Sequence, residues 1–395
     1  MTHGGRPDQG PLRVAYLTPT LHAGGAERQM VILAGALPRD LFQVRFLVLS
    51  ERGPLAEEAE AVGARVDVLG LRQQDCVPLH PRCLTAAARA LRRYRTLAAG
   101  VDIVDAWLVP AMTFAVLAQP LVRVPILLGG RRSLGDLYRS KPWYRRAAAA
   151  AAARRMAAIV ANSRAAAAEV IAQDRVQPGR VHVIPNAVLP AASSPSDRLH
   201  YRAGWGFSEN QLVVGCVANY KPEKGLGLLV DAADRLREEL PQLRVVIVGE
   251  GPLRNELEGE IRRRGLEPIV RLHGPEPDAR RVYSAFDLFV QASETEGLPN
   301  VVLEAAAAGL PIVATAVGGT TEILTADENA LLVDSGDAAG LARAIGRMAA
   351  DPELRERLGR AAREQASDFS AERLVEATAS LYLRLAGRVP PDGAT

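Results

Sequence analysis

The sequence alternates short apolar runs with helical segments, and this pattern occurs twice along the chain. In the first half, the segments 13–17, 44–49 and 101–106 are rich in apolar residues and predict strands, and each is followed by a segment of helical composition. The alternation restarts with the runs 212–218 and 244–248. Strands that are separated by helices predict a parallel sheet covered on both faces. We therefore expect an α/β protein with two Rossmann-like domains, whose parallel sheets face each other across a cleft.

The chain length also favours two domains. One core seldom organises 395 residues. Between the two alternating regions, a segment rich in Pro, Ser and Ala shows no periodicity, which is typical of a linker. We place an N-terminal domain at 1–187, a linker at 188–210, a C-terminal domain at 211–370 and a final helix at 371–395. We expect that this helix crosses back to the first domain.

Composition excludes several classes of protein. No apolar run is long enough to span a bilayer, and the first ten residues contain no apolar signal region, so we expect a cytoplasmic protein. Three cysteines cannot form a disulfide framework. Cys76, His80 and Cys83 lie close in sequence, but a fourth ligand is not evident, and we expect neither a metal site nor a cofactor.

The formal net charge of +3 hides an asymmetry. Residues 1–190 contain 25 Lys+Arg against 14 Asp+Glu, and the remaining residues contain 23 against 31. The segment Arg131–Arg155 has eight basic residues, one acid and three aromatic residues. Two interpretations stay open, a contact with an anionic membrane surface and a solvated helical face. Nucleic acid is disfavoured, because no binding module is recognisable.

A stretch in the second half, 293–324, combines two acids with a turn. Glu296 and Glu304 flank the sequence Gly-Leu-Pro-Asn, and Glu304 lies in an apolar run. Pro299 suits the first position of a helix that Gly309 ends. A carboxylate in such a helix requires a partner, and a helix start can bind an anion. The pattern indicates a ribose at Glu304 and phosphates at the helix start; the alternative is pairing with a protein arginine.

Two other loops carry candidate binding groups. Lys221 and Lys224 follow a predicted strand, where they either form an ordinary exposed turn or neutralise a diphosphate. The sequence contains no Asp-x-Asp metal clamp, so cationic side chains and helix ends would have to stabilise the phosphates. In the loop after the first strand, Gly24 and Gly25 either form a turn or bring backbone N–H groups close to a phosphate or an acceptor. His22 is a polar group in the same loop.

These motifs together resemble the retaining GT-B glycosyltransferases of family four, also called glycosyl transferases group 1. The resemblance covers nearly the whole chain and rests on the segments 24–27, 217–225, 246–253, 296–304 and 318–322. It implies the GT-B fold, with an acceptor bound mainly by the first domain and a nucleotide-diphosphate sugar bound mainly by the second. Transfer would occur without a metal, and the sugar-nucleotide would be a co-substrate.

The resemblance also implies roles for individual residues. Lys224 would hold the diphosphate, Glu304 the ribose and Glu296 a hydroxyl of the donor sugar, and Glu296 and Lys224 would be the catalytic residues. The implied donor site comprises Asn219, Lys221, Lys224, Gly249, Gly251, Glu296, Gly297, Leu298, Asn300 and Glu304. The implied loop for acceptor or phosphate comprises His22, Gly24 and Gly25.

The sequence departs from the family pattern at several positions. Asn219 stands where the family usually has Arg, and Asn186-Ala187-Val188 replaces a common Asn-Gly-x-Asp. Asp105, Trp107 and the segment 130–132 stand where histidines are common. We expect transfer to a glycan, a lipid-linked or a small-molecule acceptor. The alternatives are a sugar-nucleotide epimerase or hydrolase and a binding protein that has lost turnover.

Overall fold

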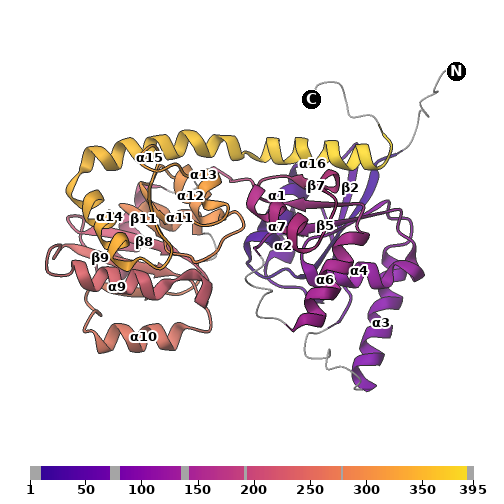
Figure 1. Cartoon of the computed structure of the whole chain (residues 1–395), viewed down its shortest axis with the longest axis horizontal. Helices are drawn as coiled ribbons and strands as arrows, with labels where there is room; N and C mark the ends of the chain where they lie inside the picture. Colours follow the sequence, from indigo (N-terminus) through magenta and orange to yellow (C-terminus); the bar gives the residue numbers. More distant parts are fainter. Residues whose placement is uncertain (1–9, 72–80, 135–141, 191–193, 277–278, 389–395) are drawn as a thin grey trace. The chain divides into compact units, whose positions relative to one another are not determined.

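The computed structural model describes residues 10–71, 81–134, 142–190, 194–276 and 279–388 (Figure 1). The chain divides into two compact units. Unit 1 consists of Met1–Asn186 together with Ala371–Thr395, and unit 2 consists of Ala187–Ser370. Each unit contains one sheet with helices on both faces.

Unit 1 is built on a seven-stranded sheet in which every strand pair is parallel. Its strands are β1 (Leu12–Thr20), β2 (Phe42–Glu51), β3 (Arg65–Val68), β4 (Ile103–Ala106), β5 (Ile126–Arg131), β6 (Ala158–Ala161) and β7 (Val181–Val183). Its helices are α1 (Gly25–Ala36), α2 (Leu55–Ala61), α3 (Pro81–Leu97), α4 (Val109–Val122), α6 (Trp143–Arg155), α7 (Arg164–Gln173) and α16 (Ala371–Leu385).

Unit 2 is built on a six-stranded, fully parallel sheet. Its strands are β8 (Leu212–Val217), β9 (Leu243–Val248), β10 (Val270–His273), β11 (Leu288–Gln291), β12 (Ile312–Thr315) and β13 (Leu331–Val333). Its helices are α8 (Pro195–Trp205), α9 (Leu226–Leu236), α10 (Arg254–Arg263), α11 (Ala279–Val282), α12 (Asn300–Ala307), α13 (Thr320–Ile323), α14 (Ala338–Ala350) and α15 (Pro352–Ala366).

The strand order places a crossover in the middle of each sheet. Unit 1 has the order β3-β2-β1-β4-β5-β6-β7, and unit 2 has the order β10-β9-β8-β11-β12-β13. In both sheets the order reverses beside the first strand, between β1 and β4 and between β8 and β11. The connections on the two sides of such a switch point leave in opposite directions. A crevice therefore forms outside the carboxyl ends of these strands, where ligands of α/β sheets bind.

The predicted linker at 188–210 requires correction, because it contains the helix α8 within unit 2. Ser194 caps this helix and forms a capping box with Asp197. Arg202 is 1% exposed and fixes α8 to the segment before β11: its Nη2 donates to Asp287 Oδ2 over 2.6 Å, and its Nε donates to the carbonyl of Ala285 over 3.0 Å. Sequence periodicity missed α8, because this short helix buries a paired arginine beside only two apolar side chains, Tyr201 and Trp205.

The last helix, α16, belongs to unit 1 and packs against α1. Tyr382 on α16 is buried, its ring lies 5.9 Å from the ring of Phe42, and its hydroxyl donates to Asp105 Oδ2 over 2.6 Å. Unit 1 is therefore completed by the end of the chain. Among the described residues, no helix is long and apolar enough to cross a membrane.

Candidate functional site

The switch point of unit 2 brings together two loops that are about 70 residues apart in sequence. The loop after β8 and the loop after β11 are joined by a hydrogen bond from the Glu294 N–H to the Glu223 carbonyl, 2.9 Å long. Gly225 has a φ of +58°, and a Cβ added there would lie 2.1 Å from the carbonyl oxygen of Ala292. The two backbones can approach this closely because residue 225 has no side chain.

Lys224 and Glu296 meet where these loops touch. The Nζ of Lys224 lies 2.7 Å from Oε1 of Glu296, and the two side chains are 24% and 10% exposed. The structure thus joins the two residues for which the resemblance implies catalytic roles. A cation and a carboxylate at the carboxyl edge of a parallel sheet can bind a phosphate and a sugar hydroxyl, respectively.

Two buried polar residues hold Glu296 in place. Its Oε1 also accepts hydrogen bonds from Ser293 Oγ over 2.7 Å and from Gln291 Nε2 over 3.3 Å. Thr315, at the end of β12, donates to the Ser293 carbonyl over 2.6 Å and to Gln291 Oε1 over 3.4 Å. Sequence reasoning did not select Gln291, Ser293 or Thr315 as site residues. One feature of the sequence could have identified two of them: Gln291 and Thr315 are polar residues at the carboxyl ends of buried strands.

Glu304 lies on α12 with a buried tyrosine as one of its partners. The hydroxyl of Tyr283 donates to Glu304 Oε2 over 2.8 Å, and Tyr283 is 1% exposed. Burial, together with the nearby Glu304 carboxylate, raises the pKa of Tyr283 well above its usual value, so the phenol stays a donor. The helix begins one residue later than expected, because Pro299 is its N-cap with a ψ of 111°. Asn300 is its first residue.

The remaining candidate donor residues lie in loops of the same unit. Gly249 and Gly251 follow β9 and approach the backbones of Ala218 and Tyr220. Leu298 is 5% exposed and packs in the core of unit 2, so its side chain does not face a ligand. A Cβ added to Gly319 would lie 1.9 Å from the carbonyl oxygen of Gly297, so the loops after β11 and β12 also touch.

Asn219 and Lys221 are exposed residues of the loop after β8. The N–H of Lys221 donates to the Asn219 carbonyl over 2.8 Å. Lys221 lies two residues after Asn219, so the loop carries a second cation in addition to Lys224. The resemblance implies an arginine at position 219, and Lys221 is a residue of the same loop that carries the same positive charge.

In unit 1, the candidate glycine loop follows β1. Gly24 is the N-cap of α1, and Gly25 is its first residue. His22 Nε2 lies 2.8 Å from Oε1 of Glu51, at the end of β2, and both side chains are more than half exposed. A Cβ added to Gly53 would meet the backbone of Leu21 at 2.4 Å, so the loops after β1 and β2 pack together and present His22 at the carboxyl edge of the sheet.

Two positions where the family commonly has histidines are buried in unit 1. Asp105 is 4% exposed, and burial raises the pKa of its carboxyl group even though it accepts from Tyr382 and lies near Arg132. The guanidinium of Arg132 lies 4.0 Å from the centroid of the Trp107 ring, and its Nη1 donates to Asn186 Oδ1 over 3.0 Å. Burial lowers the pKa of Arg132 to about 10. These residues support the interior of unit 1.

The predicted membrane segment also requires correction at its start. Arg131 is buried and forms ion pairs with Glu169 over 3.1 Å and with Asp174 over 3.2 Å. Arg131 and Arg132 thus pair inside the protein, because the end of β5 lies in the interior of the sheet. Residues 135–141, which contain two of the predicted basic residues, lie outside the described residues.

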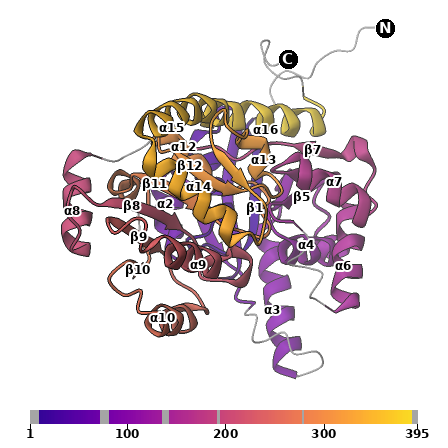
Figure 2. The ribbon, with the colours of Figure 1, turned by 60° about the vertical axis from the view of Figure 1, so that its left-hand side comes forward.

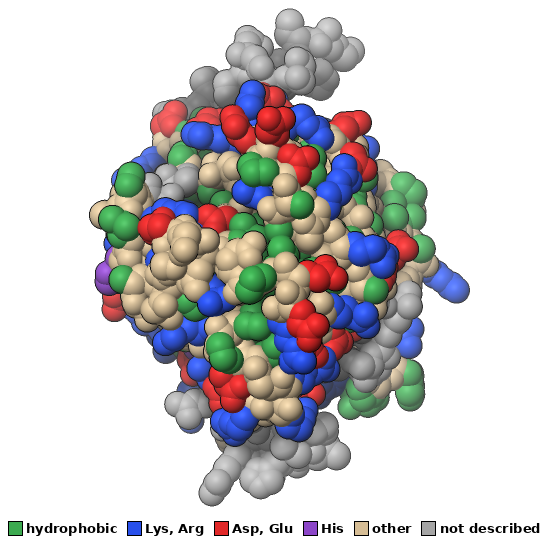
Figure 3. All heavy atoms as spheres, turned by 90° about the vertical axis from the view of Figure 1, so that its left-hand side faces the viewer, with side chains coloured by type: hydrophobic (Ala, Val, Ile, Leu, Met, Phe, Trp, Pro, Cys, Tyr) green, Lys and Arg blue, Asp and Glu red, His purple; other side chains and the backbone are tan. Residues whose placement is uncertain are grey.

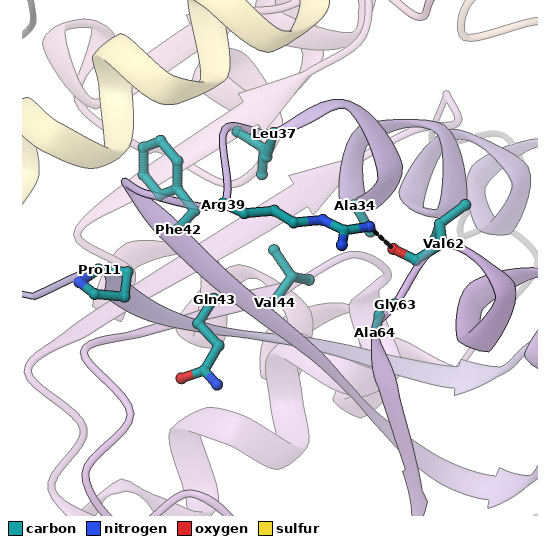
Figure 4. Close-up of a pocket in the computed structure, with 10 residues that line it drawn as sticks. All are labelled: Pro11, Ala34, Leu37, Arg39, Phe42, Gln43, Val44, Val62, Gly63 and Ala64. Atoms are coloured by element: carbon teal, nitrogen blue, oxygen red, sulfur yellow. Dashed lines mark hydrogen bonds between the residues drawn. The ribbon is translucent and has the colours of Figure 1, made fainter.

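A pocket of about 300 Å³ lies elsewhere in unit 1 (Figure 4). It is formed by the amino-terminal ends of β1 and β2, the end of α1 and the loop after α2. Arg39 extends along it and donates from Nη2 to the Val62 carbonyl over 3.0 Å. Since ligands of such sheets bind at the carboxyl ends of strands, this pocket is separate from the candidate site.

No group of three or more His, Cys, Asp or Glu side chains is arranged for a metal ion among the residues that the structure describes. Cys76 and His80 lie outside the described residues, as does the side chain of Cys83. The two loops at the switch point of unit 2 carry Lys224 in contact with Glu296, and Lys221 lies in the first of these loops. The two parallel sheets define an α/β protein with two Rossmann-like domains, and a cation and a carboxylate meet at the switch point of the second.

Comparison with protein families assigns this class more closely. A model described as Glycosyltransferase Family 4 matches residues 23–191, and one described as Glycosyl transferases group 1 matches residues 197–365. The chain belongs to these group 1 glycosyltransferases, and its fold is GT-B. The expected family and fold are confirmed.

Individual relatives agree with this assignment. A D-inositol 3-phosphate glycosyltransferase of Kribbella flavida is 34% identical over 227 residues, which are 55% of this chain and 54% of the relative. The lipopolysaccharide core biosynthesis glycosyltransferase LpsE of Rhizobium meliloti is 36% identical over 179 residues, 45% of this chain and 50% of the relative. The chain thus spans about half the length of the curated relatives that it matches.

Solved structures share the whole fold at lower identity. Alr3699/HepE of Anabaena in complex with UDP-glucose has a TM-score of 0.81 at 23% identity, covering 94% of this chain and 99% of that one. WaaG, a glycosyltransferase involved in lipopolysaccharide biosynthesis, has a TM-score of 0.70 at 19% identity, covering 93% and 99%. At these identities the likeness supports the fold alone.

Proposed function

We propose that this protein is a retaining glycosyltransferase that moves a sugar from a nucleotide-diphosphate sugar to a glycan, a lipid-linked or a small-molecule acceptor, without a metal. The observation that carries the proposal is the contact between Lys224 and Glu296 at the switch point of unit 2. In this proposal Lys224 is the cation that binds the diphosphate and Glu296 is the carboxylate that binds the sugar, and their contact supports a shared site. Family membership and the UDP-glucose complex of a protein with the same fold support the choice of ligand.

The proposed reaction breaks the bond between the anomeric carbon and the diphosphate oxygen. Negative charge then develops on the leaving diphosphate, where Lys224 and the backbone N–H groups at the start of α12 stabilise it. The acceptor oxygen forms the new bond on the same face of the sugar. Its proton passes to the leaving phosphate oxygen, so no separate base and no covalent nucleophile take part. The Glu296 carboxylate stabilises the positive charge that develops on the sugar.

The test begins with a thermal-shift screen of UDP-, GDP- and ADP-sugars. A ligand present at about 100 times its Kd stabilises the folded state by about 2.7 kcal/mol, so the correct donor should raise the melting temperature clearly. Release of nucleoside diphosphate from that donor is then measured with candidate acceptors, with and without excess chelator.

We expect turnover to persist in chelator, since Lys224 supplies the charge that a metal would otherwise provide. Loss of all turnover on chelation, restored by Mg²⁺ or Mn²⁺, would contradict the metal-free mechanism. Donor consumption that is the same with and without every acceptor would instead favour a hydrolase or an epimerase. Inversion at the anomeric carbon of the product would contradict retention.

A further inference from the structure

Three helices, α3, α4 and α6, form one layer on one face of the unit 1 sheet. Their buried residues join the same hydrophobic cluster as β1, β4 and β5, and α4 packs against both α3 and α6. Figures 1 and 2 both show the three helices next to one another. We refer to α3, α4 and α6 as the arginine-rich layer. Its outer side faces away from the sheet.

Charge in this layer has a single sign. The sequences of α3, α4 and α6 contain five, zero and four arginines, nine in all, and no Asp or Glu. The arginines after residue 85 are exposed. By contrast, acidic and basic side chains are interspersed on the face of the molecule shown in Figure 3. A surface with one sign of charge attracts a partner of the opposite sign.

The same layer exposes large hydrophobic side chains. Among the described residues, six large hydrophobic side chains are exposed, and four of them lie on α4 and α6. Leu117 and Leu121, one turn apart on α4, are 74% and 56% exposed, and Trp143 and Tyr144, at the start of α6, are 79% and 52% exposed. The exposed arginines of this layer are thus accompanied by exposed leucines on α4 and exposed aromatic side chains on α6.

We infer that the arginine-rich layer docks on the surface of an anionic lipid bilayer. Arginines bind the lipid headgroups, while tryptophan and tyrosine take positions at the boundary between headgroups and acyl chains. A soluble polyanion would bind the arginines but would leave the leucines and Trp143 in water. The exposed hydrophobic side chains therefore favour a lipid surface over a polyanion. This inference uses unit 1 alone and is independent of the proposed reaction.

The structure places the surface differently from the sequence prediction. Arg131 and Arg132 are paired inside the protein, and Arg154 donates to the Asp174 carbonyl over 2.9 Å. Arg145 and Arg146, in the first turns of α6, are exposed and adjoin Trp143. Substitution of these two arginines therefore tests lipid binding without disturbing the core.

The experiment measures binding of the full chain to vesicles of phosphatidylcholine and to vesicles that also contain phosphatidylglycerol, without donor or acceptor. We expect sedimentation with the anionic vesicles only, and weaker binding at high salt. The double substitution Arg145→Gln and Arg146→Gln should lower the partition coefficient by about fivefold per arginine, or about 25-fold. The matched control is Arg343→Gln with Arg360→Gln, two exposed arginines of unit 2, and it should leave binding unchanged.

Tryptophan fluorescence supplies a second readout. The other two tryptophans of the chain, Trp107 and Trp205, are 1% and 4% exposed, so only Trp143 should shift to shorter wavelength when vesicles are added. Trp143→Phe should remove this shift and keep the melting temperature.

Three outcomes would overturn the inference. The first is that the wild type does not bind anionic vesicles at low salt. The second is that the control variant loses as much binding as the Arg145 and Arg146 variant. The third is that heparin binds through these two arginines while vesicles cause no shift of the Trp143 fluorescence. The last outcome would identify a soluble polyanion as the partner. None of them would bear on glycosyl transfer, because the assay contains no substrates.

Discussion

Glu296 and Glu304 perform different tasks in the proposed site, and their surroundings differ accordingly. Glu296 is held by Lys224, Ser293 and Gln291 through one oxygen, Oε1. Glu304 lies on α12 and accepts from the buried hydroxyl of Tyr283. The first carboxylate is thus coupled to Lys224, the proposed cation for the diphosphate, whereas the second is oriented by a buried tyrosine.

This difference predicts that only one of the two glutamate substitutions weakens nucleotide binding. Glu304→Gln should weaken binding of bare nucleoside diphosphate by about 1.5–3 kcal/mol, the contribution of a hydrogen bond to a charged group. Glu296→Gln should keep or increase that affinity, because Lys224 loses its competing anion, and should lower turnover. Calorimetric titration with UDP and GDP measures the affinities, and the release of diphosphate measures turnover.

The control for this comparison is Glu294→Gln, a substitution of an exposed glutamate in the same loop, which should change neither quantity. Melting temperatures of all variants show whether a loss of function follows a loss of folding. Equal nucleotide affinity for the wild type and Glu304→Gln would refute the role of Glu304.

At the level of elements, the loops at the carboxyl end of the unit 2 sheet are joined by direct backbone approach. The turn at Gly225 permits the approach of the β8 loop to the β11 loop, and Gly319 permits the approach of the β12 loop. Both glycines belong to the segments that carry the family resemblance. Their structural role is to bring the loops together, so that Lys224 reaches Glu296.

Gly225→Ala should therefore destabilise unit 2 and weaken nucleotide binding. The new Cβ would lie 2.1 Å from the Ala292 carbonyl oxygen at a φ of +58°, so we expect a cost of more than about 1 kcal/mol in the free energy of unfolding. Gly227→Ala is the matched control, because its nearest neighbour, Glu260 Oε2, is 4.0 Å away, and alanine favours the helix by about 1 kcal/mol at most. Unfolding in denaturant measures the free energy of unfolding of both variants. Equal values for the two variants would contradict the close approach of residue 225 to the Ala292 carbonyl.

At the level of the whole molecule, the two ends of the chain together form unit 1. Tyr382 and Asp105 are 277 residues apart, and their 2.6 Å hydrogen bond is buried between α16 and the sheet. Burial raises the pKa of Asp105, so the protonated carboxyl group is favoured in the folded state. The stability from Asp105 is then complete below the unfolded-state pKa and decreases as pH rises toward the folded-state value.

We therefore expect the wild type to lose stability relative to Asp105→Asn as the pH rises from about 4. Asparagine keeps an acceptor for Tyr382 but does not ionise, so it serves as the reference for the titration. Tyr382→Phe removes the hydrogen bond itself and should cost about 1 kcal/mol. Unfolding curves at several pH values test both effects. A stability difference between wild type and Asp105→Asn that is constant with pH would show that Asp105 does not titrate in this way.

Local patterns in the sequence predicted the two parallel sheets, and the resemblance of its motifs to the family implied the GT-B fold. Strands such as β6 and β12, buried along their whole length, appear as short runs of mainly apolar residues, and the helices between such strands require the parallel arrangement. The donor-site loops could be recognised for the same reason, because each is a short segment directly after such a run. The contact between Lys224 and Glu296 was not predicted.

Tertiary structure decided which of these segments became neighbours. The order β9-β8-β11-β12 places Lys224 beside Glu296 across 72 residues, and the end of β5 lies in the interior, where Arg131 and Arg132 pair with the protein instead of facing a membrane. The helix α8 depends on the buried pair of Arg202 and Asp287, which no apolar periodicity indicates. The sequence by itself determined elements and fold class, because burial imposes a local period on the chain. Strand order, buried ion pairs and the return of α16 to unit 1 were decided by contacts between distant residues, which leave no local period.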